Sequence, residues 1–234
     1  MQLAERMGEL DWYHTLELEP GLVTPGIVDL RPHVQRYGLP ERMDGMRALE
    51  VGTFDGFWAF EMERRGARVV AIDVEDDRDF DWPAARRPQR FSERPQGLAF
   101  ELAHEAYGST VERRISSVYE ATPEELGTFD LVFCGSVLIH LRDQVLALER
   151  IAALCDDLLI SVEPYHRGFS LLPLPAARYR AMRDKSVVFW EPNLRGWRHM
   201  LLTAGFRSVE QRDRFQIRSR EGWKVRHVVQ HAHV

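Results

Sequence analysis

Residues 48–58 read Ala48-Leu49-Glu50-Val51-Gly52-Thr53-Phe54-Asp55-Gly56-Phe57-Trp58, an apolar strand that runs through a glycine-containing turn into a helix. Gly52 and Gly56 let backbone amides approach a ligand closely at the helix N-terminus. The spacing is Glu-x-Gly-x-x-x-Gly, and Phe54 stands where a Gly-x-Gly-x-x-Gly dinucleotide motif has its second glycine. The turn therefore predicts a ligand site and disfavours NAD.

The strand after this helix ends in an acid. Residues 69–72 are apolar, and Asp73 follows them about twenty residues beyond Gly52. At that spacing a carboxylate can accept hydrogen bonds from both hydroxyls of a ribose.

Short β-branched runs alternate with helical patterns along the middle of the chain. The expected strands cover 47–51, 68–74, 112–118, 130–134 and 157–162, and the expected helices cover 57–65, 96–107 and 142–154. This alternation predicts an α/β fold with a doubly wound, mostly parallel sheet. A helix over 193–204, stopped by Gly205, precedes two strands at 206–218 and 224–231, which predict a C-terminal antiparallel hairpin.

The composition favours one globular domain with a small appendage. The chain has 234 residues, of which 44% are hydrophobic and 29% charged, and these values exclude disorder, collagen-like repeats and coiled coil. We expect residues 1–41 to form an N-terminal cap and residues 42–234 to form the main domain, with a lid inserted at about 164–192.

Cysteine usage and hydropathy bear on location. Cys134 and Cys155 lie in apolar runs without metal-ligand spacing, so we expect reduced core thiols and no bound metal. No leader-like start and no apolar run of about 18 residues is present, which favours a cytoplasmic protein without a membrane partner.

The net charge of −5 is unevenly distributed. From residue 164 onward there are 14 basic and 5 acidic residues, a net +9. This basic third is compatible with an anionic substrate or RNA, and equally with a solvated arginine-rich face.

Taken together, the glycine turn, Asp73 and the terminal hairpin resemble the class I S-adenosylmethionine-dependent methyltransferases. The resemblance implies a Rossmann-like fold, S-adenosyl-L-methionine as cofactor and S-adenosyl-L-homocysteine as product. It implies methionine contacts around the turn, a ribose contact at Asp73, adenine contacts after the third strand and a sulfonium site after the fourth. The cofactor-binding residues implied are Glu50, Gly52, Thr53, Asp55, Gly56, Asp73, Ser117, Val118, Gly135 and Ser136.

Three further stretches, 129–140, 177–183 and 188–193, are similar to the bacterial tRNA wobble-uridine (5-carboxymethoxyuridine) methyltransferases. Those enzymes carry a longer N-terminal extension and hold a carboxylated cofactor through a lysine, a tyrosine and an arginine. Arg226 lies where the arginine would be, whereas Ile139 stands at the tyrosine position and the turn at 24–26 replaces the lysine. Losing two charge-assisted donors should weaken binding of a carboxylated cofactor, so we expect the plain cofactor.

Methyl transfer from a sulfonium is an in-line displacement, for which a protein supplies alignment and, where needed, a base for the acceptor proton. Loops at the carboxyl edge of the sheet supply the candidate catalytic residues His140, His166 and Tyr165. His14, in the cap, is a fourth candidate for the base. For His140 the equal alternative is a structural role, in which it only shapes the pocket. An aromatic wall with an arginine clamp would suit a planar or anionic acceptor, whereas a hydrophobic helix packed on the sheet is the alternative for the insertion. The predicted substrate-binding residues are Tyr13, His14, Arg178, Tyr179, Trp190 and Arg226.

The leading hypothesis is a methyltransferase of specialised metabolism that acts on a small-molecule acceptor, at oxygen. Two alternatives stay open: a tRNA wobble-uridine methyltransferase, with tRNA as the partner, and a catalytically silent subunit that binds S-adenosylmethionine. The sequence leaves the acceptor and the oligomeric state open.

Overall fold

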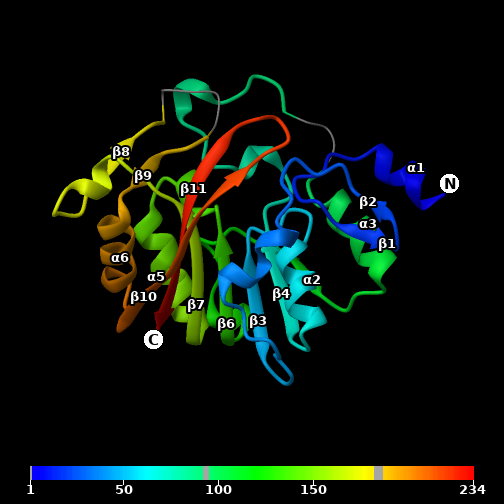
Figure 1. The fold of residues 1–234 in the computed structure, drawn as a ribbon, viewed down its shortest axis with the longest axis horizontal. Helices are drawn as coiled ribbons and strands as arrows, with labels where there is room; N and C mark the ends of the chain where they lie inside the picture. The colour runs from blue at the N-terminus through cyan, green and yellow to red at the C-terminus, as the bar shows by residue number, and fades with distance from the viewer. Residues whose placement is uncertain (1, 92–94, 182–186) are drawn as a thin grey trace.

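The computed structural model describes residues 2–91, 95–181 and 187–234. In these residues the main sheet has seven strands in the order β10-β11-β7-β6-β3-β4-β5 (Figure 1). The five strands β3 (Arg47–Val51), β4 (Arg68–Asp73), β5 (Glu112–Ile115), β6 (Phe129–Gly135) and β7 (Cys155–Pro164) are parallel. At one edge, β11 (Lys224–His233) pairs antiparallel with both β7 and β10 (Ser208–Arg218). The predicted doubly wound sheet with a C-terminal antiparallel hairpin is confirmed.

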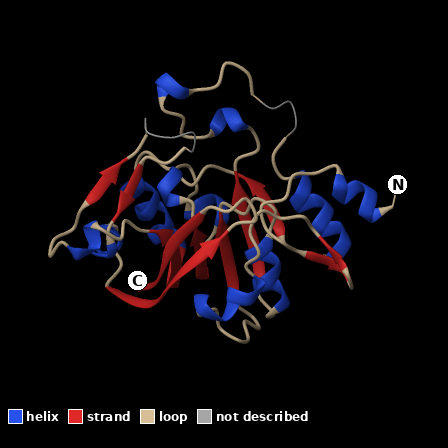
Figure 2. Cartoon of the chain, turned by 45° about the horizontal axis from the view of Figure 1, so that its top comes forward, coloured by secondary structure: helices blue, strands red, loops and turns tan. Residues whose placement is uncertain are grey.

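Helices cover both faces of this sheet, as the alternating pattern predicts (Figure 2). On one face, α2 (Phe57–Arg64) and α3 (Leu98–Tyr107) pack with the N-terminal residues, and on the other α5 (Gln144–Leu154) and α6 (Leu194–Thr203) pack beside the short α4 (Pro123–Leu126). Cys134 and Cys155 are buried and free in the second of these cores.

Two helix starts differ from the sequence prediction for local reasons. The helix α3 begins after Gly97, whose φ of 88° lies outside the helical region, instead of at residue 96. The helix α5 begins after Asp143, whose side chain accepts a hydrogen bond from the Leu146 amide at 3.0 Å and so caps the helix.

The N-terminal residues pack on the core of the main sheet. They contain α1 (Leu3–Gly8), the two-stranded sheet of β1 (Glu17–Glu19) and β2 (Leu22–Val23), and the 3₁₀ helix Arg31–Tyr37. Their buried side chains, among them Trp12, Leu16 and Val28, belong to the same hydrophobic cluster as α2 and α3. We refer to residues 11–30 as the cap segment.

Two long connections lie at the carboxyl edge of the parallel strands. The first joins β4 to α3. Its described residues are 74–91 and 95–97; residues 74–91 contain the 3₁₀ turns Asp77–Asp79 and Ala84–Arg86 and cross the top of the molecule in Figure 1. Arg86 donates a hydrogen bond of 2.9 Å to the carbonyl of Ala181, which belongs to the second connection. The contact holds the first connection over the carboxyl edge of the sheet, where it forms a roof. No sequence pattern indicated this arrangement.

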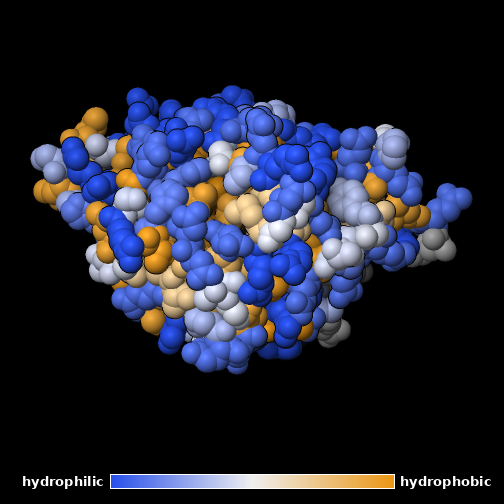
Figure 3. Space-filling view, turned by 90° about the horizontal axis from the view of Figure 1, so that it is seen from below, coloured by the Kyte–Doolittle hydropathy of each residue, from blue (hydrophilic) through white to orange (hydrophobic). Residues whose placement is uncertain are grey.

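The second connection is the predicted insertion at 164–192. In its described residues, 164–181 and 187–192, it contains the 3₁₀ turn Phe169–Leu171 and a hairpin of β8 (Ala177–Tyr179) and β9 (Trp190–Pro192), and no helix packed on the sheet. Met182 and Arg183, which belong to the wobble-uridine resemblance, lie outside the described residues. Leu171 is 88% exposed and Leu174 51% exposed, and hydrophobic surface shows at the left end of Figure 3, the side on which β8 and β9 lie.

Asn193 ties this insertion to α6. Its fully buried side chain accepts hydrogen bonds from the amides of Gly196 at 2.7 Å and Ala176 at 3.1 Å, and donates to the carbonyls of Phe169 and Leu174. Replacing one such group leaves several buried polar atoms without a partner.

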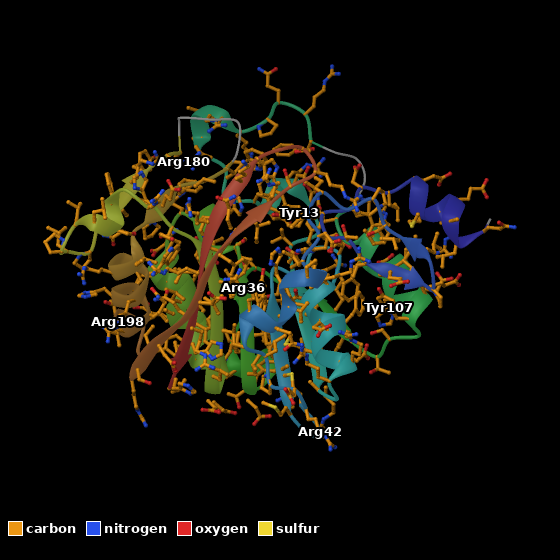
Figure 4. All side chains as sticks on the ribbon, viewed as in Figure 1. Tyr13, Arg36, Arg42, Tyr107, Arg180 and Arg198 are labelled. Atoms are coloured by element: carbon orange, nitrogen blue, oxygen red, sulfur yellow. The ribbon has the colours of Figure 1, made fainter. Side chains whose placement is uncertain are left out.

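We therefore expect Asn193→Ala to lower the free energy of unfolding by about 2–4 kcal/mol, measured by urea denaturation. The matched control is Arg198→Ala on the exposed face of α6 (Figure 4), for which we expect a change within about 0.5 kcal/mol. Equal stability of the two variants would contradict this assignment.

Candidate functional site

A cavity of about 520 Å³ lies at the carboxyl ends of β3, β4, β6 and β7. The chain leaves β3 in one direction and β6 in the other, so the cavity sits where the strand order reverses. Open α/β sheets bind their ligands at this switch point. The cap segment and the 74–97 connection supply the remaining walls.

The turn after β3 has a left-handed backbone. Gly52 and Gly56 have φ angles of 74° and 87°, and Phe54, between them, has a φ of 50°. A side chain at Gly52 would place its Cβ 2.4 Å from Cγ2 of Val137. Position 52 therefore requires glycine both for its backbone angle and for the close approach of the next wall.

Asp73 ends β4 and lines the cavity. Its carboxylate accepts hydrogen bonds from the amides of Phe54 at 2.7 Å and Val74 at 2.8 Å. Burial raises the pKa of Asp73, because desolvation outweighs these two hydrogen bonds. Each carboxylate oxygen retains a lone pair beyond these bonds, and the residue fits the predicted contact with a ribose.

Glu50 also lines the cavity, and two groups of its own segment bind it. The carboxylate accepts hydrogen bonds from the Thr53 hydroxyl at 2.6 Å and from the Ala59 amide at 2.9 Å. Burial raises the pKa of Glu50 to about 8, so the carboxyl group is mostly protonated at neutral pH. Thr53 thus supports Glu50 from behind the cavity wall.

Asp55 faces away from the cavity. It is fully buried and accepts hydrogen bonds from the amides of Tyr13 at 2.9 Å and His14 at 2.7 Å, and from Nδ1 of His14. Gly56 is enclosed by Phe60, because a Cβ at this position would lie 2.3 Å from the Phe60 ring.

Of the ten predicted cofactor-binding residues, seven line the cavity, and Thr53, Asp55 and Gly56 do not. The seven are Glu50, Gly52, Asp73, Ser117, Val118, Gly135 and Ser136.

The wall beyond β6 is held by buried polar groups that the sequence analysis did not single out. Ser136, with a φ of 59°, is hydrogen-bonded through Oγ to Nε2 of the buried His227 at 3.0 Å. Oε1 of Glu163 accepts hydrogen bonds from the amides of Val137 and Leu138, both at 3.1 Å. Together these contacts fix a strained turn at the cavity surface.

Of the three predicted catalytic residues, only His140 lines the cavity. Its Nδ1 is hydrogen-bonded to the Val187 carbonyl, and burial lowers the pKa of the imidazole because desolvation outweighs this bond. His166 accepts a hydrogen bond from the Phe169 amide through Nδ1, and Tyr165 packs against the core under α5 and α6. Neither reaches the cavity wall.

Among the predicted substrate-binding residues, Tyr13 and His14 line the cavity. Arg178 is paired with Glu191, and the rings of Tyr179 and Trp190 contact each other in a tilted arrangement, with centroids 4.8 Å apart, away from the cavity. Arg226 is not part of the wall either. The predicted arginine clamp does not form there, because the guanidinium of Arg178 is ion-paired with Glu191 within the insertion.

Aromatic side chains that the sequence analysis missed make up much of the wall. They come from five separate segments and carry no local pattern that could have revealed them. They are Tyr37, Trp58, Phe80, Trp82, Tyr119 and Phe133.

The cavity wall is acidic. Besides the protonated Glu50, its carboxyl groups belong to Asp73, Asp79 and Asp81, and within 2–91, 95–181 and 187–234 no lysine or arginine contributes to it. A cationic ligand is attracted by such a wall, whereas an anionic one finds no counter-charge.

The sheet order, the glycine turn and an acid at the end of the next strand define a class I S-adenosylmethionine-dependent methyltransferase domain. A family model described as a methyltransferase domain matches residues 28–211, so the chain belongs to this family. Both the predicted family and the predicted cofactor, S-adenosyl-L-methionine, are confirmed.

Similar solved structures support the same fold. The N-terminal domain of EvdMO1 with S-adenosylhomocysteine bound has a TM-score of 0.69 and 21% identity, over 99% of this chain and 95% of that one. Magnesium protoporphyrin IX methyltransferase of Synechocystis PCC 6803, also with S-adenosylhomocysteine bound, has a TM-score of 0.54 and 19% identity, over 82% and 76%.

A tRNA U34 carboxymethyltransferase of Desulforapulum autotrophicum is 25% identical over 166 residues, which are 70% of this chain and 45% of that protein. The chain thus spans about half the length of this curated relative. No helix in the described part of the chain has the length and apolar character needed to span a membrane.

The residues of the cavity fit the cofactor of this class. Asp73 would hold the ribose, the walls at Ser117 and Val118 would flank the adenine, and Gly135 and Ser136 would lie beside the reacting end. When bound, the cofactor supplies an electrophilic methyl group on a sulfonium.

We expect Asp73→Ala to weaken binding of S-adenosylhomocysteine by about 10- to 100-fold, because two charge-assisted hydrogen bonds to the ribose are lost. Isothermal titration calorimetry measures this, with Asp156→Ala, at an exposed position of β7, as the control. Unchanged affinity in Asp73→Ala would place the ribose elsewhere.

Glu163 gives a prediction about stability and pH. Burial raises the pKa of its carboxyl group to about 8 from an ordinary value of 4.5, so the folded state keeps a proton that the unfolded state releases. The free energy of unfolding therefore falls as pH rises from about 4.5 to about 8. Because glutamine stays neutral, Glu163→Gln should gain stability relative to the parent across this window, as followed by urea denaturation at several pH values. A stability difference independent of pH would contradict the assignment.

Proposed function

We propose that the protein transfers the methyl group of S-adenosylmethionine to a hydroxyl oxygen of a small, uncharged acceptor. The acceptor would lie in the part of the cavity between the cap segment and the ends of β6 and β7. The observation that carries this proposal is the make-up of that part of the wall, which is aromatic and carries hydroxyl and imidazole groups but no lysine or arginine among the described residues.

The size of the cavity supports a small acceptor. A volume of about 520 Å³ lies within the usual range for small-molecule sites and has to hold the cofactor as well. The cap segment is fixed to the core by Asp55 and by its own buried side chains, so it closes one side of the cavity.

The polar groups on the wall support a hydroxylated acceptor. Tyr13 and Tyr37 line the cavity, and no hydrogen bond to either hydroxyl is found among the described residues. Burial raises the pKa of both phenols, to about 12 for Tyr13, so both hydroxyls stay protonated. Two neutral hydroxyls beside aromatic faces suit a ring that carries hydroxyl groups.

The structural neighbours add support. The N-terminal domain of EvdMO1 has also been crystallised in the presence of S-adenosylhomocysteine and D-fucose. A third neighbour is 1,6-didemethyltoxoflavin-N1-methyltransferase of Burkholderia thailandensis, with a TM-score of 0.53, 17% identity, and 81% and 71% of the two chains covered. The molecules named with these proteins are small.

In-line transfer then needs the chain to do two things. It must hold the acceptor oxygen opposite the bond to sulfur, which the strained turn at Ser136 and the aromatic wall support. It must also take up the hydroxyl proton, because an alcohol is a weak nucleophile until its proton is removed.

The acidic wall argues against the wobble-uridine alternative. A carboxylated cofactor would need a counter-charge, but Arg226 lies off the cavity wall and Ile139 carries no polar group. A basic third of the sequence remains compatible with RNA binding, so tRNA is included in the test.

The test is a transfer assay with isotopically labelled S-adenosylmethionine and three sets of acceptors. The first set contains neutral monosaccharides and deoxysugars, D-fucose among them; the second contains the corresponding uronic acids; the third is unmodified tRNA. We expect transfer to the neutral set and loss of transfer in Asp73→Ala. Transfer only to tRNA or uronic acids would overturn the proposal, and so would cofactor binding without transfer to any acceptor, which fits the silent subunit.

A further inference from the structure

His14 and Asp55 form a buried carboxylate–imidazole pair at the edge of the cavity. A carboxylate can only accept, so the contact between them requires the proton on Nδ1 of His14. Asp55 is fully buried, and the side chain of His14 is 11% exposed. Asp55 belongs to the turn after β3, and His14 belongs to the cap segment, 41 residues earlier.

The second ring nitrogen of His14 is open to the cavity. Nε2 makes no hydrogen bond among the described residues, and it is not one of the buried polar atoms that lack a partner. His14 itself lines the cavity. With the proton on Nδ1, Nε2 presents a lone pair to whatever the cavity holds.

The position of His14 is fixed from three sides. The Asp55 carboxylate accepts a hydrogen bond from its amide, and the Thr24 hydroxyl donates to its carbonyl at 3.0 Å. The backbone of Gly26 passes so close that a Cβ there would lie 2.1 Å from the carbonyl carbon of His14. Only glycine permits this approach, and the imidazole is therefore held rigidly.

His140, the other imidazole on the wall, has no charged partner. Its Nδ1 is bonded to a neutral carbonyl, that of Val187, which supplies no negative charge to stabilise an imidazolium. The carboxylate of Asp55, in contrast, stabilises an imidazolium at His14 when a proton arrives on Nε2.

We infer that His14 is the general base of the transfer reaction and that Asp55 is its positioning residue. The acceptor oxygen forms a new bond to the methyl carbon of the cofactor while its own O–H bond breaks. The proton moves to Nε2 of His14, and the electron pair of the broken C–S bond stays on sulfur. The positive charge thus passes from the sulfonium to an imidazolium beside Asp55. This inference rests on the proposed function.

The first test distinguishes loss of the proton acceptor from loss of the contact that holds the cap segment to Asp55. In His14→Asn the side-chain amide occupies the position of Nδ1–H and can still donate to Asp55, but the group at Nε2 is gone. We expect kcat on a neutral acceptor found in the transfer assay to fall by about 10²- to 10⁴-fold, with affinity for S-adenosylhomocysteine within about threefold. Imidazole added to His14→Ala should restore part of the rate. The control, His199→Gln on the exposed face of α6, should keep the parent rate.

The outcomes distinguish the two proposals. Transfer by the parent protein with an unchanged kcat in His14→Asn would overturn the role of His14 and leave the proposed function standing. A fall in kcat accompanied by an equal loss of cofactor affinity, without rescue by imidazole, would show that His14 is only structural. Absence of transfer to every hydroxyl acceptor would overturn both.

A second test needs no acceptor. Nuclear magnetic resonance of protein labelled with ¹⁵N-histidine reports which ring nitrogen of His14 carries the proton. We expect the neutral ring to carry its proton on Nδ1, with a far-downfield proton signal that disappears in His14→Asn and Asp55→Asn. A proton on Nε2 would overturn the inference, because the lone pair that accepts the substrate proton would then be absent.

Discussion

The left-handed turn after β3 is the constraint on which the site depends. Positive φ angles at Gly52, Phe54 and Gly56 reverse the backbone within five residues, and a non-glycine residue there costs about 1–3 kcal/mol. The Phe54 amide offsets part of this cost through its hydrogen bond to Asp73. The same turn directs Asp55 into the protein, where its carboxylate binds the cap segment. One strained turn therefore sets the position of the Asp73 carboxylate, the floor of the cavity and the position of its cap.

The parts of the fold that could be predicted are those with local patterns. Apolar strands and the acid at Asp73 identify the sheet and one edge of the site, because each signal lies within a few residues of its element. The role of Asp55 had no such signal, since its partners Tyr13 and His14 precede it by 42 and 41 residues. The roof at residues 74–97 was also missed, because a proline-rich segment of irregular backbone has no periodicity to detect.

The arginine-rich C-terminal third shows why composition did not identify the ligand's charge. Arg178 and Arg180, both in this third of the sequence, approach the carboxylate of Glu191. A net charge counts these groups but does not show which of them are paired with one another in the folded chain. What remains on the cavity wall is negative in the described residues. A negative wall favours a cofactor that carries a sulfonium cation and imposes no charge requirement on a neutral acceptor.

Two imidazoles line the same cavity, and their partners give them different chemistry. A carbonyl, as at His140, fixes which nitrogen carries the proton but does little to stabilise a second positive charge. A buried carboxylate, as at His14, does both. The carboxylate belongs to the turn after β3 and the imidazole to the cap segment, so the contact between them joins the proposed base to the wall that encloses the acceptor. Acceptor enclosure and proton removal therefore depend on the same contact.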